Sequence, residues 1–289
     1  MCKFRLIFVL AAFSILLPMN ARCETAPELT AESSADLSAD DSVGHRSGLP
    51  LLTSRFEKFG YKAPLPFGAS IGVMFAAQHF IMDNIRIDGE DVEVFSISSA
   101  RGINTMVMPK LDMWLLPFID LYAFGGYMTG VMNVDVTVYD IPLLGDRRLP
   151  LEFDFTGGLL GGGMTLVGGY SFIFAMLDGN YSKASLSTFE SSLDMYMASA
   201  RLGVTTGSEE SQAMFWLGGM YQNLDQTLQE SFQLVEGGSA SLVEIDVGVK
   251  EAWNMVAGSR LHAGRRLSIL VEAGFIGRRQ LFANIEYRF

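Results

Sequence analysis

Histidine is the side chain best suited to acid–base chemistry near neutral pH, and this chain has three. His79 is closely followed by Asp83, whose carboxylate is of the type that orients a catalytic imidazole. His45 lies in a predicted disordered leader, and His262 lies next to a predicted turn at the opposite end of the strands from His79. A catalytic histidine also needs a nucleophile or a positioned water, which no recognisable motif supplies here. His79 and Asp83 are therefore the candidate catalytic residues, and the alternative is that they are ordinary polar side chains.

A second group of chemically active side chains is charged and falls on one face of the predicted strands. Large apolar residues such as Met106 and Trp216 share this face. The charged members are Lys110, Asp112, Asp178, Arg201, Arg260, Glu272, Glu286 and Arg288. Both signs are present, so two interpretations stay open. These residues either form ion pairs that fill an interior or line a narrow polar conduit.

The elements that must position these residues are strands, because apolar and polar residues alternate from Gly68 onward. The predicted strands are 68–78, 103–115, 119–131, 151–167, 170–182, 192–206, 212–224, 252–263, 266–276 and 280–289. Their apolar series, for example Phe153, Phe155 and Leu159, are expected on the outer face. Segments 84–98 and 232–249 could add strands, so eight or twelve remain alternatives to ten.

The links between these strands alternate in length. Short links at 116–118, 168–169, 206–211 and 264–265 alternate with long ones at 79–102, 132–150, 183–191 and 225–251. Only the link 277–279 breaks the rule. This alternation predicts an all-β fold, a single closed antiparallel barrel with both termini at the same end. The apolar link 225–251 is expected either to cover the lumen as a lid or to stand as a strand pair.

The chain ends in Leu281-Phe282-Ala283-Asn284-Ile285-Glu286-Tyr287-Arg288-Phe289, which places apolar and polar side chains on opposite strand faces. This ending, with Tyr287 two residues before a terminal Phe289, resembles the C-terminal signature strand of bacterial outer-membrane β-barrels. Asn284 departs from the signature, which usually has glycine there. The resemblance implies a transmembrane barrel in the bacterial outer membrane, with short periplasmic turns, longer extracellular loops, and recognition of this strand by the barrel-assembly machinery.

The N-terminal residues support the same compartment. A basic start and an apolar stretch from Leu6 to Pro18 predict a secretory signal peptide over residues 1–23, cleaved after Ala21 or Cys23. Residues 24–66 are predicted to be an acidic disordered leader and an interfacial segment. The barrel domain is predicted to cover residues 67–289.

Charge and motif content exclude several function classes. The net charge of −11 argues against nucleic acid binding. The glycines of Gly157–Gly163 lack the Lys-Ser/Thr of a phosphate loop, and are better explained by close packing of lumen side chains against the wall. We expect no metal site and no cofactor, since no metal-ligating spacing occurs.

The leading hypothesis is an integral outer-membrane barrel for passive small-solute transport, or one with a structural or surface role, with membrane lipid as its partner. One alternative is an outer-membrane enzyme with a rim site near His79. The other is an adhesion or interaction protein that acts through links 79–102, 132–150 and 225–251.

Overall fold

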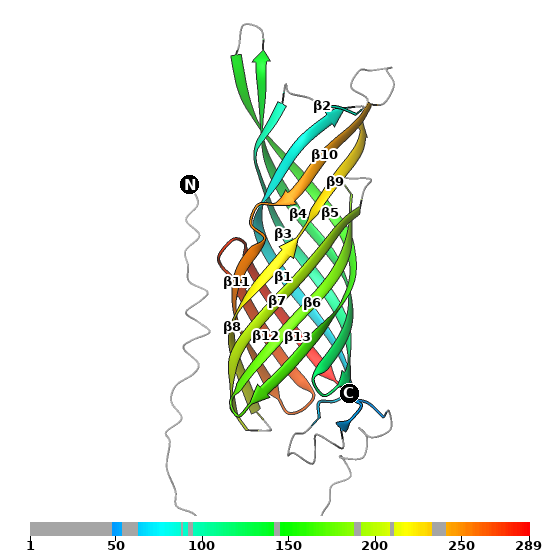
Figure 1. The fold of residues 1–289 in the computed structure, drawn as a ribbon, viewed down its shortest axis with the longest axis vertical. Coiled ribbons are helices and arrows are strands. Elements are labelled where there is room, and N and C mark those ends of the chain that lie inside the picture. The colour runs from blue at the N-terminus through cyan, green and yellow to red at the C-terminus, as the bar shows by residue number, and fades with distance from the viewer. Residues whose placement is uncertain are drawn as a thin grey trace, which may run out of the picture. The chain divides into compact units, whose positions relative to one another are not determined.

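A computed structural model describes residues 48–53, 63–87, 89–91, 95–141, 145–187, 192–208, 211–232 and 241–289. The predicted signal peptide and the predicted leader up to residue 47 lie outside these ranges. The described chain is built mainly from antiparallel β-strands (Figure 1). No helix in these ranges is long and apolar enough to span a membrane.

Ten strands form one closed antiparallel wall, which confirms the predicted barrel and its strand number (Figure 1). The wall strands are β1 (Phe67–Ile87), β3 (Phe95–Leu116), β4 (Ile119–Ile141), β5 (Gly145–Tyr170), β6 (Ile173–Leu186), β7 (Ser192–Gly207), β8 (Ser211–Asn223), β11 (Trp253–Ala263), β12 (Leu267–Gly274) and β13 (Arg279–Arg288). Each pairs with the next, and β13 pairs with β1 to close the barrel. We call the end where β1 begins and β13 ends the near end.

The terminal strand shows how the sequence builds this wall. Leu281, Ile285 and Tyr287 of β13 are about half exposed on the outer face. The alternating residues Asn284 and Glu286 are buried in the lumen. Because successive strand residues point to opposite faces, an apolar exterior and a polar interior arise from a single alternating pattern. This arrangement is the reverse of a soluble sheet protein and is typical of barrels in membranes.

Three further strands lie towards the far end: β2 (Glu90–Asp91), β9 (Asp225–Phe232) and β10 (Ser241–Val249). β10 pairs with β1 from Phe80 to Ile87, whereas β13 pairs with β1 from Gly68 to Ala77. The neighbour of β1 in the wall therefore changes from β13 to β10. Where the structure describes residues 225–251, β9 and β10 pair with each other, as predicted for a strand pair.

The turn between β12 and β13 lies at the level where β10 replaces β13 as the partner of β1. Asn254 on β11 binds the backbone of this turn. The Asn254 Oδ1 atom accepts hydrogen bonds from the backbone N–H groups of Ile276, at 3.1 Å, and Arg278, at 3.4 Å. This side chain closes the unusually short link at 277–279. Elsewhere at the far end, strands run beyond their predicted bounds: β4 and β5 continue pairing through most of residues 132–150.

One predicted strand face is wrong. Phe155 and Leu159 were expected on the outer face, but each is only 8% exposed and lies in the lumen. The outward residue is Leu160, which is 71% exposed. The cause is the run of glycines from Gly157 to Gly163, interrupted only by Leu159 and Leu160, which offers almost no side chains from which to read the face.

Candidate functional site

Five of the predicted lumen charges meet near the near end, and we call them the terminal ion network: Lys110, Asp112, Arg260, Glu286 and Arg288. Arg288 contacts both Asp112 and Glu286. Lys110 Nζ lies 3.4 Å from Asp112 Oδ1, and Arg260 Nη2 lies 3.6 Å from Glu286 Oε2. The Asp112 side chain has no exposed surface. The network is therefore a set of ion pairs from three strands, β3, β11 and β13, around two buried carboxylates.

Arg288 and Asp112 meet across an intervening strand because a glycine stands between them. Arg288 on β13 and Asp112 on β3 both lie directly opposite Gly68 on β1. A Cβ atom at Gly68 would lie 2.6 Å from the Asp112 carboxylate oxygens. Arg288 also donates a hydrogen bond to the carbonyl of Leu65, at 2.9 Å. The ion pair thus joins three neighbouring strands and the segment that precedes β1.

A second ion pair links Arg201 on β7 to Glu272 on β12. Arg201 Nε and Nη2 donate to the two Glu272 oxygens at 2.7 and 3.0 Å, and Trp216 Nε1 donates to Glu272 Oε2 at 2.7 Å. Gly258 on β11 lies directly opposite both Trp216 and Glu272, and its missing Cβ would stand 2.5 Å from the indole ring. Glycine again lets side chains of non-adjacent strands meet.

Asp178 is held by neutral groups. Its Oδ2 atom accepts hydrogen bonds from the hydroxyls of Tyr122, at 2.8 Å, and Thr165, at 2.7 Å, and Asn180 Nδ2 donates to Oδ1 at 3.3 Å. Tyr122 packs over Gly163, where a Cβ would lie 2.6 Å from its ring. Neither Tyr122 nor Thr165 was predicted as a lumen contact from the sequence, although both lie opposite lumen positions in the register.

Arg278 is a buried cation of a different kind. It is 8% exposed, and its guanidinium donates to Gln280 Oε1 at 2.8 Å and Gln78 Oε1 at 3.4 Å, and contacts Met220 Sδ at 2.9 Å. Among the described residues no carboxylate pairs with it. In the sequence, Arg278 falls in the predicted link 277–279. Even-numbered residues from Gln280 to Arg288 face the lumen. Extending this alternation by two residues would have placed Arg278 in the lumen as well.

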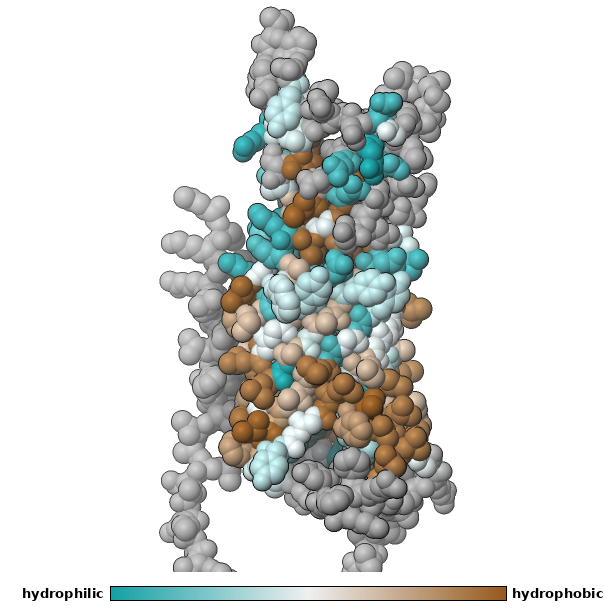
Figure 2. Space-filling model, in the orientation of Figure 1, coloured by the Kyte–Doolittle hydropathy of each residue, from teal (hydrophilic) through white to brown (hydrophobic). Residues whose placement is uncertain are grey.

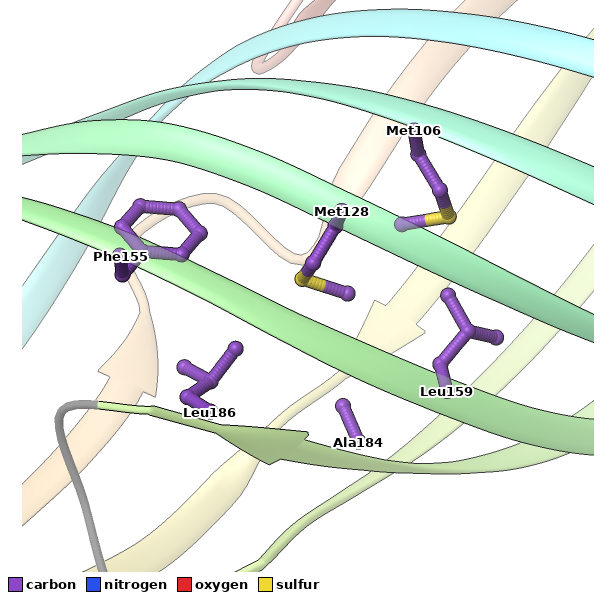
Figure 3. Close-up of a cluster of buried hydrophobic side chains, with 6 residues drawn as sticks. All are labelled: Met106, Met128, Phe155, Leu159, Ala184 and Leu186. Atoms are coloured by element: carbon purple, nitrogen blue, oxygen red, sulfur yellow. The ribbon is translucent and has the colours of Figure 1, made fainter.

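An apolar cluster fills the lumen on the β3–β7 side. Met106, Met128, Phe155, Leu159, Ala184 and Leu186 form its buried centre (Figure 3). A second cluster of Met82, Ala100, Val134 and Val247 lies further towards the far end, and Met132 and Leu193 pack against both. Methionine is a flexible filler of irregular interiors, which accounts for its abundance on this face.

Both candidate catalytic residues lie on β1. His79 is exposed on the outer face of β1, and its side chain makes no hydrogen bond to a described carboxylate or hydroxyl. Asp83 lies further along β1, opposite Asp246 on β10. No group of three metal-ligating side chains occurs in the described ranges.

The signature residues Tyr287 and Phe289 are about half exposed at the near end. The Phe289 ring stacks on Phe67 with a centroid distance of 6.1 Å, and the two residues exchange backbone hydrogen bonds. The last residue is thus anchored to the first residue of β1, at the seam where the barrel closes.

Comparison with known proteins finds no matching family model and no similar curated protein. Solved structures do match. The outer membrane protein OprG from Pseudomonas aeruginosa is 13% identical with a TM-score of 0.42, over 78% of this chain and 98% of that one. The β domain of the Bordetella autotransporter BrkA is 10% identical with a TM-score of 0.33, over 78% of this chain and 100% of that one. The Pseudomonas putida toluene transporter TodX is 9% identical with a TM-score of 0.27, over 78% and 88%. Similarity at this level assigns neither a solute nor a partner.

Proposed function

We propose that this protein is an integral barrel of the bacterial outer membrane whose lumen is closed at rest, with a structural or surface role. The observation that carries the proposal is a belt of exposed apolar side chains around the part of the barrel nearest the near end (Figure 2). Its members include Ile71, Leu111, Leu177, Leu202, Leu217, Val271 and Ile285, each at least 43% exposed. A soluble protein would not leave such a continuous surface in water.

Aromatic residues mark both margins of this belt. Tyr181 pairs with Tyr196 across β6 and β7, and Tyr221 with Trp253 across β8 and β11, all on the outer face. Tyr170, Phe172 and Phe289 are more than half exposed at the near end. Aromatic rings at two levels are typical of the interfaces of a bilayer.

Strand length agrees with a membrane span. β12 has 8 residues and β13 has 10, close to the 9–11 residues that a tilted transmembrane strand needs.

The lumen supports closure over open-pore transport. The terminal ion network, the Arg201–Glu272 pair and the apolar clusters occupy successive levels of the interior. A ten-stranded barrel has little room beyond its own side chains. The long strands beyond the belt then form a rigid extension above the membrane, and the exposed Tyr287 and Phe289 remain available for recognition during assembly.

Replacing Leu202 by Arg is expected to lower the unfolding free energy by about 2–4 kcal/mol, because an arginine in the bilayer core loses its hydration. The matched control is Leu149→Arg, at a side chain that is 48% exposed far beyond the belt. Equilibrium unfolding in urea from lipid vesicles measures both variants. Equal effects of the two substitutions would contradict the proposed position of the membrane.

Planar-bilayer recordings test closure of the lumen. Refolded wild-type protein is expected to show no steady single-channel steps, because buried ion pairs and apolar side chains block the path. A double substitution Lys110→Ser and Asp112→Ser removes two members of the terminal ion network without changing the net charge. It is also expected to show no steady steps, because the Arg201–Glu272 pair and the apolar clusters still block the lumen. Steady steps from the wild-type protein would instead favour passive transport of small solutes.

A further inference from the structure

Four basic residues lie together on the outer surface where β1 exchanges its neighbours. We call His79, Arg101, Lys250 and Arg279 the basic patch, and all four are exposed. His79 on β1 lies directly opposite Arg101 on β3, and Arg279 on β13 lies opposite Ala77. The backbone N–H of Lys250 donates to the His79 carbonyl at 3.1 Å. Four segments that are distant in sequence thus bring their basic side chains to one place.

Local charge sets this patch apart from the rest of the molecule. The whole chain carries a net charge of −11, yet within its described part none of the four residues forms a side-chain ion pair. Glu251 follows Lys250 in the chain, and Asp83 follows His79 by four residues on β1. Asp135 on β4 accepts a hydrogen bond from Ser99 Oγ at 3.0 Å. Three permanent positive charges therefore remain without a described counter-charge.

The patch lies just beyond the apolar belt. On β1, Phe75 points to the outer face and is 53% exposed. Ala77 and then His79 follow on the same face, each two residues further along the strand. Trp253, at 68% exposed, and Phe275, at 54%, mark the same margin beside Lys250 and Arg279. An aromatic margin marks the interface of a bilayer. The residues next to it on the side away from the belt therefore lie at the level of the lipid headgroups.

A cleft in the wall adjoins the patch on one side. β1 and β3 pair as far as Phe80 opposite Ala100, and a cleft of about 220 Å³ opens at that point. His79 and Lys250 line it together with Met82 and Ile97, whose apolar side chains belong to the second lumen cluster or pack against it. Two of the four basic residues thus line a recess in the wall.

We propose that the basic patch binds the phosphate of a phosphorylated lipid in the outer leaflet of the membrane. Arginine offers paired N–H donors that match two phosphate oxygens, and lysine adds a point charge. Basic groups at headgroup level attract anionic lipids. This inference rests on the proposed membrane location, and it adds a specific lipid chemistry to one side of the barrel.

Native mass spectrometry of the refolded full chain tests this binding. The detergent-solubilised protein is mixed with equal amounts of two lipids with the same acyl chains, one a phosphatidic acid and the other a phosphatidylcholine. Wild-type protein is expected to retain the phosphatidic acid about tenfold more than the neutral-headgroup lipid. The triple variant Arg101→Gln, Lys250→Gln, Arg279→Gln is expected to lose this preference.

The matched control is Arg148→Gln, Arg265→Gln, Arg266→Gln, which removes the same charge from exposed residues away from the patch. It is expected to keep the wild-type preference. Equal retention in both triple variants, whether high or low, would overturn the proposal, because the bound phosphate would then not depend on this patch. Insertion into vesicles of phosphatidylcholine alone is measured in parallel, so failure of the membrane location is distinguished from failure of lipid selectivity.

Discussion

Replacing Glu272 by Leu is expected to lower the free energy of unfolding by about 3–5 kcal/mol, because it leaves a buried cation unpaired. Arg201 donates two hydrogen bonds to Glu272, and the two side chains are 14% and 5% exposed. Trp216 loses its acceptor in the same substitution. Arg201, Glu272 and Trp216 lie inside the barrel, where water screens electrostatic interactions only weakly.

The double substitution Arg201→Met, Glu272→Leu is expected to recover at least half of this loss. Buried ion pairs that are replaced by apolar residues of similar volume often leave stability unchanged, since the desolvation cost of both charges disappears. Equilibrium unfolding of the wild type, the two single variants and the double variant forms a thermodynamic cycle. Additive effects of the single substitutions would show that the two side chains are not coupled.

Replacing Arg288 by Met is expected to cost about 3–5 kcal/mol of unfolding free energy, since Asp112 and Glu286 would lose their shared partner. The guanidinium also bonds the carbonyl of Leu65 and lies 5.5 Å from the centre of the Trp114 ring. Its loss therefore weakens the closing seam of the barrel, where β13 meets β1. Urea unfolding and the temperature at which heat-modifiable gel mobility is lost report this change.

The control for this prediction is Arg278→Met. Arg278 is as deeply buried as Arg288, but its described partners are Gln280, Gln78 and Met220. No buried carboxylate is left behind when it is removed, so the expected loss is about 1 kcal/mol. A larger loss for Arg278 than for Arg288 would mean that the carboxylates are not the source of the stabilisation.

Local patterns account for most of the fold prediction. Alternation of apolar and polar residues is a property of each strand alone, so it identified the ten wall strands and the lumen face of Glu286 and Arg288. It also placed Lys110 and Asp112 on one face, two residues apart. It failed at Phe155 and Leu159, because neighbouring glycines carry no side chain by which the face can be read.

The partners within the lumen were decided only by the tertiary structure. Arg201 and Glu272 lie on β7 and β12, with β8 and β11 between them in the wall, and they meet through the interior. Arg288 and Asp112 meet over Gly68, across an intervening strand. Neither pairing has a local sequence signal, because it depends on how the closed sheet is staggered.

The sequence by itself determined an alternating, membrane-type set of strands that ends in an aromatic signature. The closed wall decided which charges pair with one another, which buried cation has no carboxylate partner among the described residues, and where four basic residues gather on the surface. The physical reason is that strand alternation acts between neighbours in the chain. Ion pairs and surface patches act between atoms that only barrel closure and the stagger of its strands bring together.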